Sequence, residues 1–126
     1  MSSMKMYEIL MSQEDYKCLE KLASYDFTPS KGDWLRFAAE DLAKRLFWYN
    51  DQGEEKYWIL SHPTTVKFGK MTRRMTLYLG PIDIRNLEAI AESLDMDGLR
   101  GNLSEIFRIV IRDAYANYFE KEERYV

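Results

Sequence analysis

Three side chains that can form hydrogen bonds, Arg74, Thr76 and Tyr78, stand at alternate positions of the run RMTLYL, residues 74–79. Successive side chains of a β-strand point to opposite faces, so these three share one face while the apolar residues between them share the other. A guanidinium, a hydroxyl and a phenol can all bond to base-pair edges in the DNA major groove, where each base pair displays a distinct pattern. The competing interpretation is an ordinary solvated strand face.

An earlier run, MYEILM at residues 6–11, alternates in the same way and would direct Met6, Glu8 and Leu10 outward, with Lys5 just before them. A glutamate can accept a hydrogen bond from cytosine, and apolar side chains can contact thymine methyl groups. A carboxylate also repels phosphate, and apolar residues on an exposed strand equally suit contact with protein. The sequence therefore predicts base contacts by these four residues, with protein contact as the alternative.

Both runs belong to an internal repeat in which residues 6–23 recur as residues 74–91, at a constant offset of 68. The identical pairs are Asp15 and Asp83, Leu19 and Leu87, Glu20 and Glu88, and Ala23 and Ala91. Residues 33–47 recur as residues 105–119, at an offset of 72, so the loop from Asp95 to Asn102 holds four extra residues. In each copy an apolar period of two changes to one of 3.6, which predicts a strand, a helix, a turn and a helix.

A unit of about 45 residues buries too little surface to be stable alone, and its single strand leaves an open hydrogen-bonding edge. We therefore predict an α+β, mostly α fold in one domain, residues 1–126. Residues 6–12 and 74–80 would form an antiparallel two-stranded ribbon on a four-helix core, so that repeats 5–49 and 74–120 make an internal pseudo-dimer. Residues 50–73 would be a linker with a hairpin made by residues 56–60 and 64–68, and residues 121–126 a tail.

Basic residues and helix starts suggest where DNA phosphates would bind. The net charge of −3 disfavours nucleic acid, but residues 61–80 contain four basic residues and no acidic one. Free amides at a helix N-terminus also attract phosphate, although Ser and Asn cap helices in any protein, and a basic run is often only solvated. The predicted phosphate contacts are Ser30, Lys31, Lys67, Lys70, Arg73, Arg100, Asn102 and Ser104.

These features resemble the ribbon-helix-helix DNA-binding proteins. The strand RMTLYL, the step of eight residues from Leu79 to Leu87, and the helix start at residues 104–108 carry the resemblance, which covers residues 5–49 and 74–120. Two chains normally make this fold, whereas this chain carries both copies itself. In that respect it is similar to the duplicated ribbon-helix-helix regulators of archaeal filamentous viruses. The resemblance implies a sequence-specific transcription regulator, a repressor or an activator, that binds double-stranded DNA in the host cytoplasm and associates with itself along the DNA.

The remaining residues offer little for catalysis. His62 and Cys18 are each the single residue of their type, and the sequence contains no phosphate-binding loop and no metal-ligand spacing. We therefore expect no enzyme, cofactor, metal ion, small-molecule substrate or membrane span, and a single thiol favours an intracellular protein. The alternative function is an antitoxin-like module that sequesters a partner protein through Met6, Leu10 and the aromatic residues around the linker.

Overall fold

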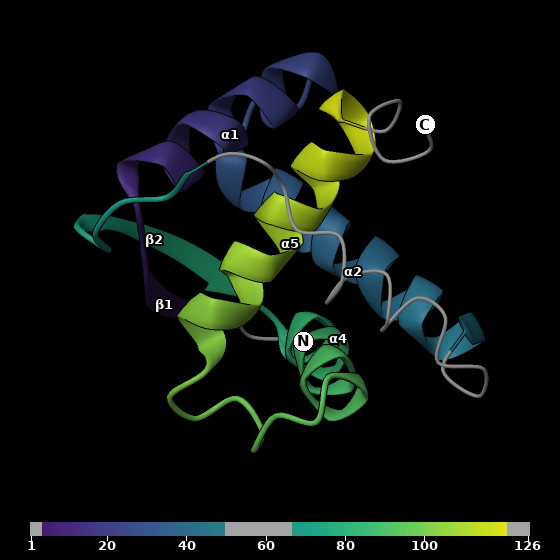
Figure 1. Ribbon diagram of the computed structural model, residues 1–126. Coiled ribbons are helices and arrows are strands. Elements are labelled where there is room, and N and C mark those ends of the chain that lie inside the picture. The colour runs from purple at the N-terminus through teal and green to yellow at the C-terminus, as the bar shows by residue number, and fades with distance from the viewer. Residues whose placement is uncertain (1–3, 50–66, 121–126) are drawn as a thin grey trace.

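The computed structural model describes residues 4–49 and 67–120, which form two strands and four helices. In chain order these are β1 (Lys5–Met11), α1 (Gln13–Tyr25), α2 (Lys31–Tyr49), β2 (Arg73–Leu79), α4 (Pro81–Ser93) and α5 (Leu103–Phe119). The strands lie along one side of the helices (Figure 1). The predicted class, α+β and mostly helical, is confirmed.

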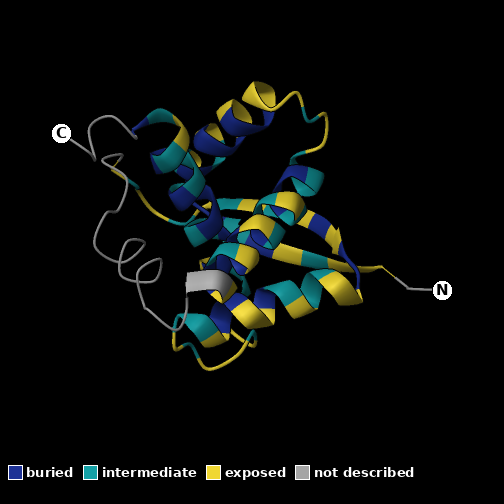
Figure 2. Cartoon of the chain, turned by 90° about the vertical axis from the view of Figure 1, so that its right-hand side faces the viewer, coloured by how far each residue is buried: buried dark blue, intermediate teal, exposed yellow. Residues whose placement is uncertain are grey.

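The strands pair with each other in antiparallel orientation, as the sequence predicted. Each begins one residue earlier than expected, and the register places Met6 opposite Tyr78, Glu8 opposite Thr76 and Leu10 opposite Arg74. Burial alternates along both strands (Figure 2). The buried positions are Ile9 and Met11 in β1 and Leu77 and Leu79 in β2. The ribbon therefore has one core-facing side and one solvent-facing side.

The first strand leads into its helix through a capping box, and the second through half of one, because Gly80 has no side chain to accept a hydrogen bond. Ser12 accepts a hydrogen bond from the Asp15 backbone amide at 3.0 Å, and the Asp15 carboxylate accepts one from the Ser12 amide at 3.0 Å. In the second copy the Asp83 carboxylate accepts a bond from the Gly80 amide at 2.8 Å, and Pro81 occupies the first turn. Both caps satisfy amides that would otherwise lack a partner at the helix start.

The core joins the two repeats because α1 packs chiefly with α5, and α2 with α4. The ribbon adds four buried apolar residues to this core: Ile9, Met11, Leu77 and Leu79. The apolar spacing of Phe107, Val110, Ile111, Ala114 and Tyr118 predicts one core-facing side of the last helix, and for Tyr118 this prediction was wrong, since the residue is 49 % exposed. Each of these main contacts joins a helix of one repeat to a helix of the other, so the two repeats share one core.

A buried ion pair links β1 and α1 to α5. The Asp15 carboxylate is fully buried and accepts two hydrogen bonds from the Arg112 guanidinium, at 2.8 and 3.0 Å. The other face of that guanidinium lies 3.8 Å from the ring centre of Phe68. Because Asp15 also holds the Ser12 cap, one carboxylate fixes both the start of α1 and the position of α5.

The segment before β2 is irregular from Lys67 to Thr72 and is held against α1 by a hydrogen bond from the Gly69 amide to the Glu14 carboxylate. The predicted hairpin placed Lys67 and Phe68 in a strand, which was wrong, since Phe68 packs under Arg112 instead. The rest of that hairpin lies outside the described residues. No helix in the described part of the chain is long and apolar enough to cross a membrane.

The first helices of the two repeats end in the same turn, 68 residues apart. Thr28 donates its amide to the Ala23 carbonyl at 2.9 Å, and Met96 donates to the Ala91 carbonyl at 2.8 Å. This turn requires a left-handed residue, usually Gly, just before the last donor. Phe27 adopts it with φ 54° and Asp95 with φ 58°. Asp tolerates that conformation better than Phe does, so Phe27 is a strained choice.

Replacing Phe27 by Gly is therefore expected to raise the free energy of unfolding by about 0.5 to 1 kcal/mol, because the relief of left-handed strain exceeds the entropy that Gly adds to the unfolded chain. The Phe27 side chain is 92 % exposed, so little packing is lost to offset the relief of strain. Denaturant unfolding of the two proteins measures the difference. Asp95→Gly is the matched control with a smaller expected gain, and a destabilised Phe27→Gly protein would contradict the assignment of strain.

Candidate nucleic-acid interface

The solvent-facing side of the ribbon gathers six side chains in three opposed pairs. Met6 faces Tyr78 at one end, Glu8 faces Thr76 in the middle, and Leu10 faces Arg74 at the other end. The Leu10 amide and carbonyl both bond to α5 and so point away from β2. These three pairs are therefore the closely spaced type of antiparallel pair, with side chains in lateral contact.

One ion pair crosses this face diagonally. Arg74 Nη1 lies 3.1 Å from Glu8 Oε1, and the two side chains are 74 % and 58 % exposed. A pair this exposed contributes little to stability because water competes for both partners. Arg74 is thus oriented over the ribbon in the free protein and can exchange Glu8 for another acceptor at small cost.

Four predicted basic contacts lie outside this face. Lys5 is exposed but is in phase with the core-facing residues, opposite Leu79. Arg73 is likewise in phase with the core-facing residues, and its guanidinium lies 3.8 Å from the ring centre of Tyr16 in α1. Lys67 and Lys70 are exposed on the segment that leads into β2. The structure therefore places these four residues outside the solvent-facing side of the ribbon, so the predicted base contact by Lys5 is not supported by its position.

The start of α5 lies against the free edge of β1. Ser104 Oγ accepts a hydrogen bond from the Leu10 amide at 2.9 Å, and Arg108 donates to the Leu10 carbonyl at 2.8 Å. These bonds satisfy backbone groups that an edge strand normally leaves open. Ser104 is one of the predicted phosphate contacts. Its hydrogen bond to β1, and any role for Arg108, were not predicted. The only signal in the sequence was that Arg36 recurs as Arg108.

The start of α2 lies against β2 but makes different contacts. Gly32 replaces Ser104 in the repeat, and a Cβ atom there would lie 3.7 Å from the Leu77 Cβ. Arg36, the counterpart of Arg108, instead donates to Asp83 at 3.0 Å. A cavity of about 520 Å³ remains between α2 and the β2 edge, lined in part by Lys31 and Tyr78. The two ends of the ribbon are therefore built differently.

The remaining predicted phosphate contacts stand at these two helix starts. Ser30 caps α2, accepting a hydrogen bond from the Asp33 amide at 3.2 Å, and Lys31 begins the helix. Asn102 precedes α5 and donates to the Gly98 carbonyl at 2.9 Å, so its side chain serves the loop. Arg100 is exposed in that loop. Since α5 begins beside Leu10 and α2 beside Leu77, the two helix starts flank opposite ends of the ribbon.

Chemically reactive groups are scarce in the part of the chain that the structure describes. Burial, with the charge of Asp15 next, raises the pKa of the Cys18 thiol to about 11, so this buried cysteine stays protonated and unreactive. No group of three His, Cys, Asp or Glu side chains among the described residues is arranged to hold a metal ion. No protein-family model, curated protein or solved structure matches this chain.

Proposed function

We propose that this chain is a sequence-specific double-stranded DNA-binding transcription regulator whose two ribbon-helix-helix repeats form an internal pseudo-dimer. One observation supports this most directly: the ribbon presents Arg74, Thr76 and Tyr78 to solvent between two helix N-termini at its opposite ends. A two-stranded ribbon fits the major groove, and helix N-termini beside it can bind the phosphates of the flanking backbone.

In this proposal the two strands read different bases. Arg74 forms a bidentate contact with guanine, Thr76 and Tyr78 offer hydroxyl groups, and Glu8 accepts from cytosine. Met6 and Leu10 contact thymine methyl groups at the two ends of the ribbon. Because the strands present different side chains in every opposed pair, the preferred DNA site is not a palindrome.

The phosphate contacts follow from atoms that remain available. Ser104 Oγ accepts from the Leu10 amide, which leaves its hydroxyl proton free to bond to a phosphate oxygen. At the other end, Lys31 and the first amides of α2 border the cavity beside β2. The acidic total charge is compatible with binding, since the basic residues at positions 67, 70, 73 and 74 are close to the ribbon in sequence.

Selection of DNA sequences from a random duplex pool, followed by titration at several salt concentrations, tests the function. The regulator predicts a selected sequence bound roughly a thousandfold more tightly than random duplex, with an affinity that falls linearly in log salt. The competing function is a module that sequesters a protein through the exposed Met6 and through Leu10. Absence of duplex binding at low salt would exclude the regulator and favour that module.

Substituting Glu8 by Gln is expected to tighten binding to random duplex by about threefold to tenfold at low salt. The change removes a negative charge from the side of the ribbon proposed to enter the groove and releases Arg74 from its ion pair. Discrimination for cytosine at the contacted position should weaken, because the amide also carries donors. Filter binding measures both effects, with Glu40→Gln in α2 as the control; equal changes in the two variants would contradict a place for Glu8 at the DNA.

A further inference from the structure

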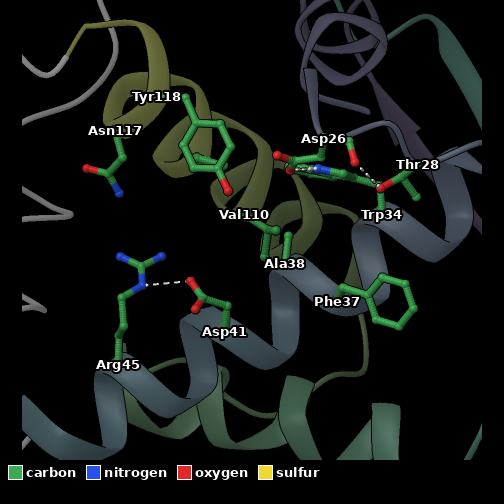
Figure 3. Close-up of a pocket in the computed structure, with 11 residues that line it drawn as sticks. Asp26, Thr28, Trp34, Phe37, Ala38, Asp41, Arg45, Val110, Asn117 and Tyr118 are labelled. Atoms are coloured by element: carbon green, nitrogen blue, oxygen red, sulfur yellow. Dashed lines mark hydrogen bonds and ion pairs between the residues drawn. The ribbon is translucent and has the colours of Figure 1, made fainter. Parts of the chain in front are cut away.

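A second surface lies where α1 ends and α2 packs beside α5, and none of its described lining residues belongs to the ribbon. There a cavity of about 450 Å³ opens between the helices (Figure 3). Aromatic rings of Trp34, Phe37 and Tyr118 line it together with the carboxylates of Asp26 and Asp41. Since all of these residues belong to α1's end, α2 and α5, a ligand there leaves the ribbon free.

The charges of this cavity favour a cation. Among the described residues, Arg45 donates to Asp41 at 3.0 Å and to the buried Asp113 at 2.6 Å, so its guanidinium is shared by at least these two carboxylates. Asp26 adds a third carboxylate, which accepts from the Trp34 indole at 2.8 Å. Burial, followed by the charges of Asp26 and Asp41, raises the pKa of the Tyr118 phenol. Both carboxylates therefore lie close enough to the phenol to disfavour its ionised form, while Arg45 acts in the opposite direction.

Exposed aromatic residues, here called the rim, line the cavity or neighbour its lining residues: Phe37 lines it, Tyr25 contacts Tyr118, and Phe27 lies in sequence between Asp26 and Thr28. Tyr25 lies 5.6 Å from Tyr118 between ring centres, and Phe37 is 60 % exposed on α2. Phe27, between the lining residues Asp26 and Thr28, is almost entirely exposed and occupies a strained left-handed position. In the other repeat Asp95 takes that position. The fold itself thus does not require an aromatic residue there, and aromatic side chains are enriched where proteins bind each other.

We propose that this surface, the acidic aromatic pocket and its rim, docks a basic segment of a partner protein. An Arg or Lys side chain of the partner enters between Asp26 and Asp41 and stacks against the aromatic walls, while apolar neighbours pack on Phe27 and Phe37. Carboxylates and ring faces both attract such cations. A free small cation would fill the cavity but leave the rim uncovered, which is why the charge and the rim together indicate a peptide segment.

Titration of the full-length protein with N-acetyl-Leu-Arg-Leu-amide, followed by NMR, tests the proposal. The indole N–H of Trp34, which bonds to Asp26, is the reporter because it lies in the pocket wall. We expect saturable shifts of this resonance and of Tyr118. N-acetyl-Leu-Gln-Leu-amide, which lacks the charge, should bind roughly tenfold more weakly, and N-acetyl-arginine methylamide, which lacks the apolar neighbours, should also bind more weakly.

A double substitution, Asp26→Asn with Asp41→Asn, should weaken binding of the arginine peptide by roughly tenfold while keeping the hydrogen bond from Trp34. The matched control, Glu88→Gln with Asp97→Asn, removes two exposed charges from α4 and the loop after it and should leave binding unchanged. Neither variant alters the ribbon, so DNA binding tests the proposed regulator separately.

Several results would overturn the proposal. Absence of shifts with the arginine peptide, or equal binding of the glutamine peptide, excludes recognition of a cation. Equal binding of N-acetyl-arginine methylamide indicates a small-molecule site and not a docked segment. Shifts of the same resonances that depend on protein concentration without any peptide assign the surface to a second copy of this chain.

Discussion

Replacing Arg74 by alanine should weaken binding to the preferred DNA site by about 1 to 3 kcal/mol, the discrimination typical of one bidentate contact to guanine. The expectation rests on the position of Arg74 on the solvent-facing side of β2, opposite Leu10, where it forms an exposed ion pair with Glu8. Binding to random duplex should fall far less, because there the side chain contributes its charge alone. Competition titrations with selected and random duplexes measure the difference.

Lys44→Ala is the matched control for this experiment, since it removes one exposed positive charge from α2, where Lys44 pairs with Glu40. It should leave sequence preference unchanged. The unfolding free energy of the Arg74→Ala protein should stay within about 0.5 kcal/mol of the parent, as expected for an exposed ion pair. A folded Arg74→Ala protein that still discriminates between the two duplexes would show that the ribbon does not read guanine through this residue.

Replacing Asp15 by alanine is expected to lower the free energy of unfolding by about 3 kcal/mol or more. The fully buried carboxylate accepts bonds from the Ser12 amide and hydroxyl and from two nitrogen atoms of Arg112. Its loss leaves the start of α1 uncapped and the guanidinium of Arg112 without its anion. Since α1 packs chiefly with α5, both repeats lose part of their common core.

Asp83→Ala is the internal comparison because Asp83 occupies the same position in the second repeat. Its carboxylate accepts from the Gly80 amide and from Arg36, and that guanidinium also has Asp33 as a partner. We therefore expect a smaller loss, about 1 to 2 kcal/mol, typical of a helix cap. Denaturant unfolding compares the two variants, and an equal or larger loss for Asp83→Ala would contradict the central place of the Asp15–Arg112 pair.

Much of the local structure could be predicted because it depends on short stretches of sequence. The alternation around residues 75–79 assigned side chains to the two faces of β2 before the register was known, and the structure has the same assignment. Ser12 followed by Asp15 has the spacing of a capping box, and Pro81 after Gly80 suits a first helical turn, so these residues predict the two helix starts that the structure has. The repeat added the one long-range prediction, the antiparallel pairing of β1 and β2, because each unit needed a partner for its strand edge.

The contacts between repeats could not be predicted in the same way. Arg108 bonds to the Leu10 carbonyl, and Arg112 to Asp15, across nearly a hundred residues of sequence. The sequence alone gave no reason to expect the hydrogen bond from the Leu10 amide to Ser104 Oγ. Gly32, the counterpart of Ser104, lies at the β2 edge and has no hydroxyl group to form such a bond. Tyr118 appeared to belong to an apolar helix face but instead forms a wall of the cavity beside α2.

The sequence by itself determined the order of strand, helix, turn and helix in each repeat and which faces of the two paired strands are apolar, since caps and periodicity act over a few residues. Only the tertiary structure decided which helix start meets which strand edge, which carboxylate is buried with a guanidinium, and where aromatic rings surround an acidic cavity. Those outcomes depend on how α2 and α5 cross and on which side chains then meet, and a long side chain such as arginine can reach several partners from one backbone position.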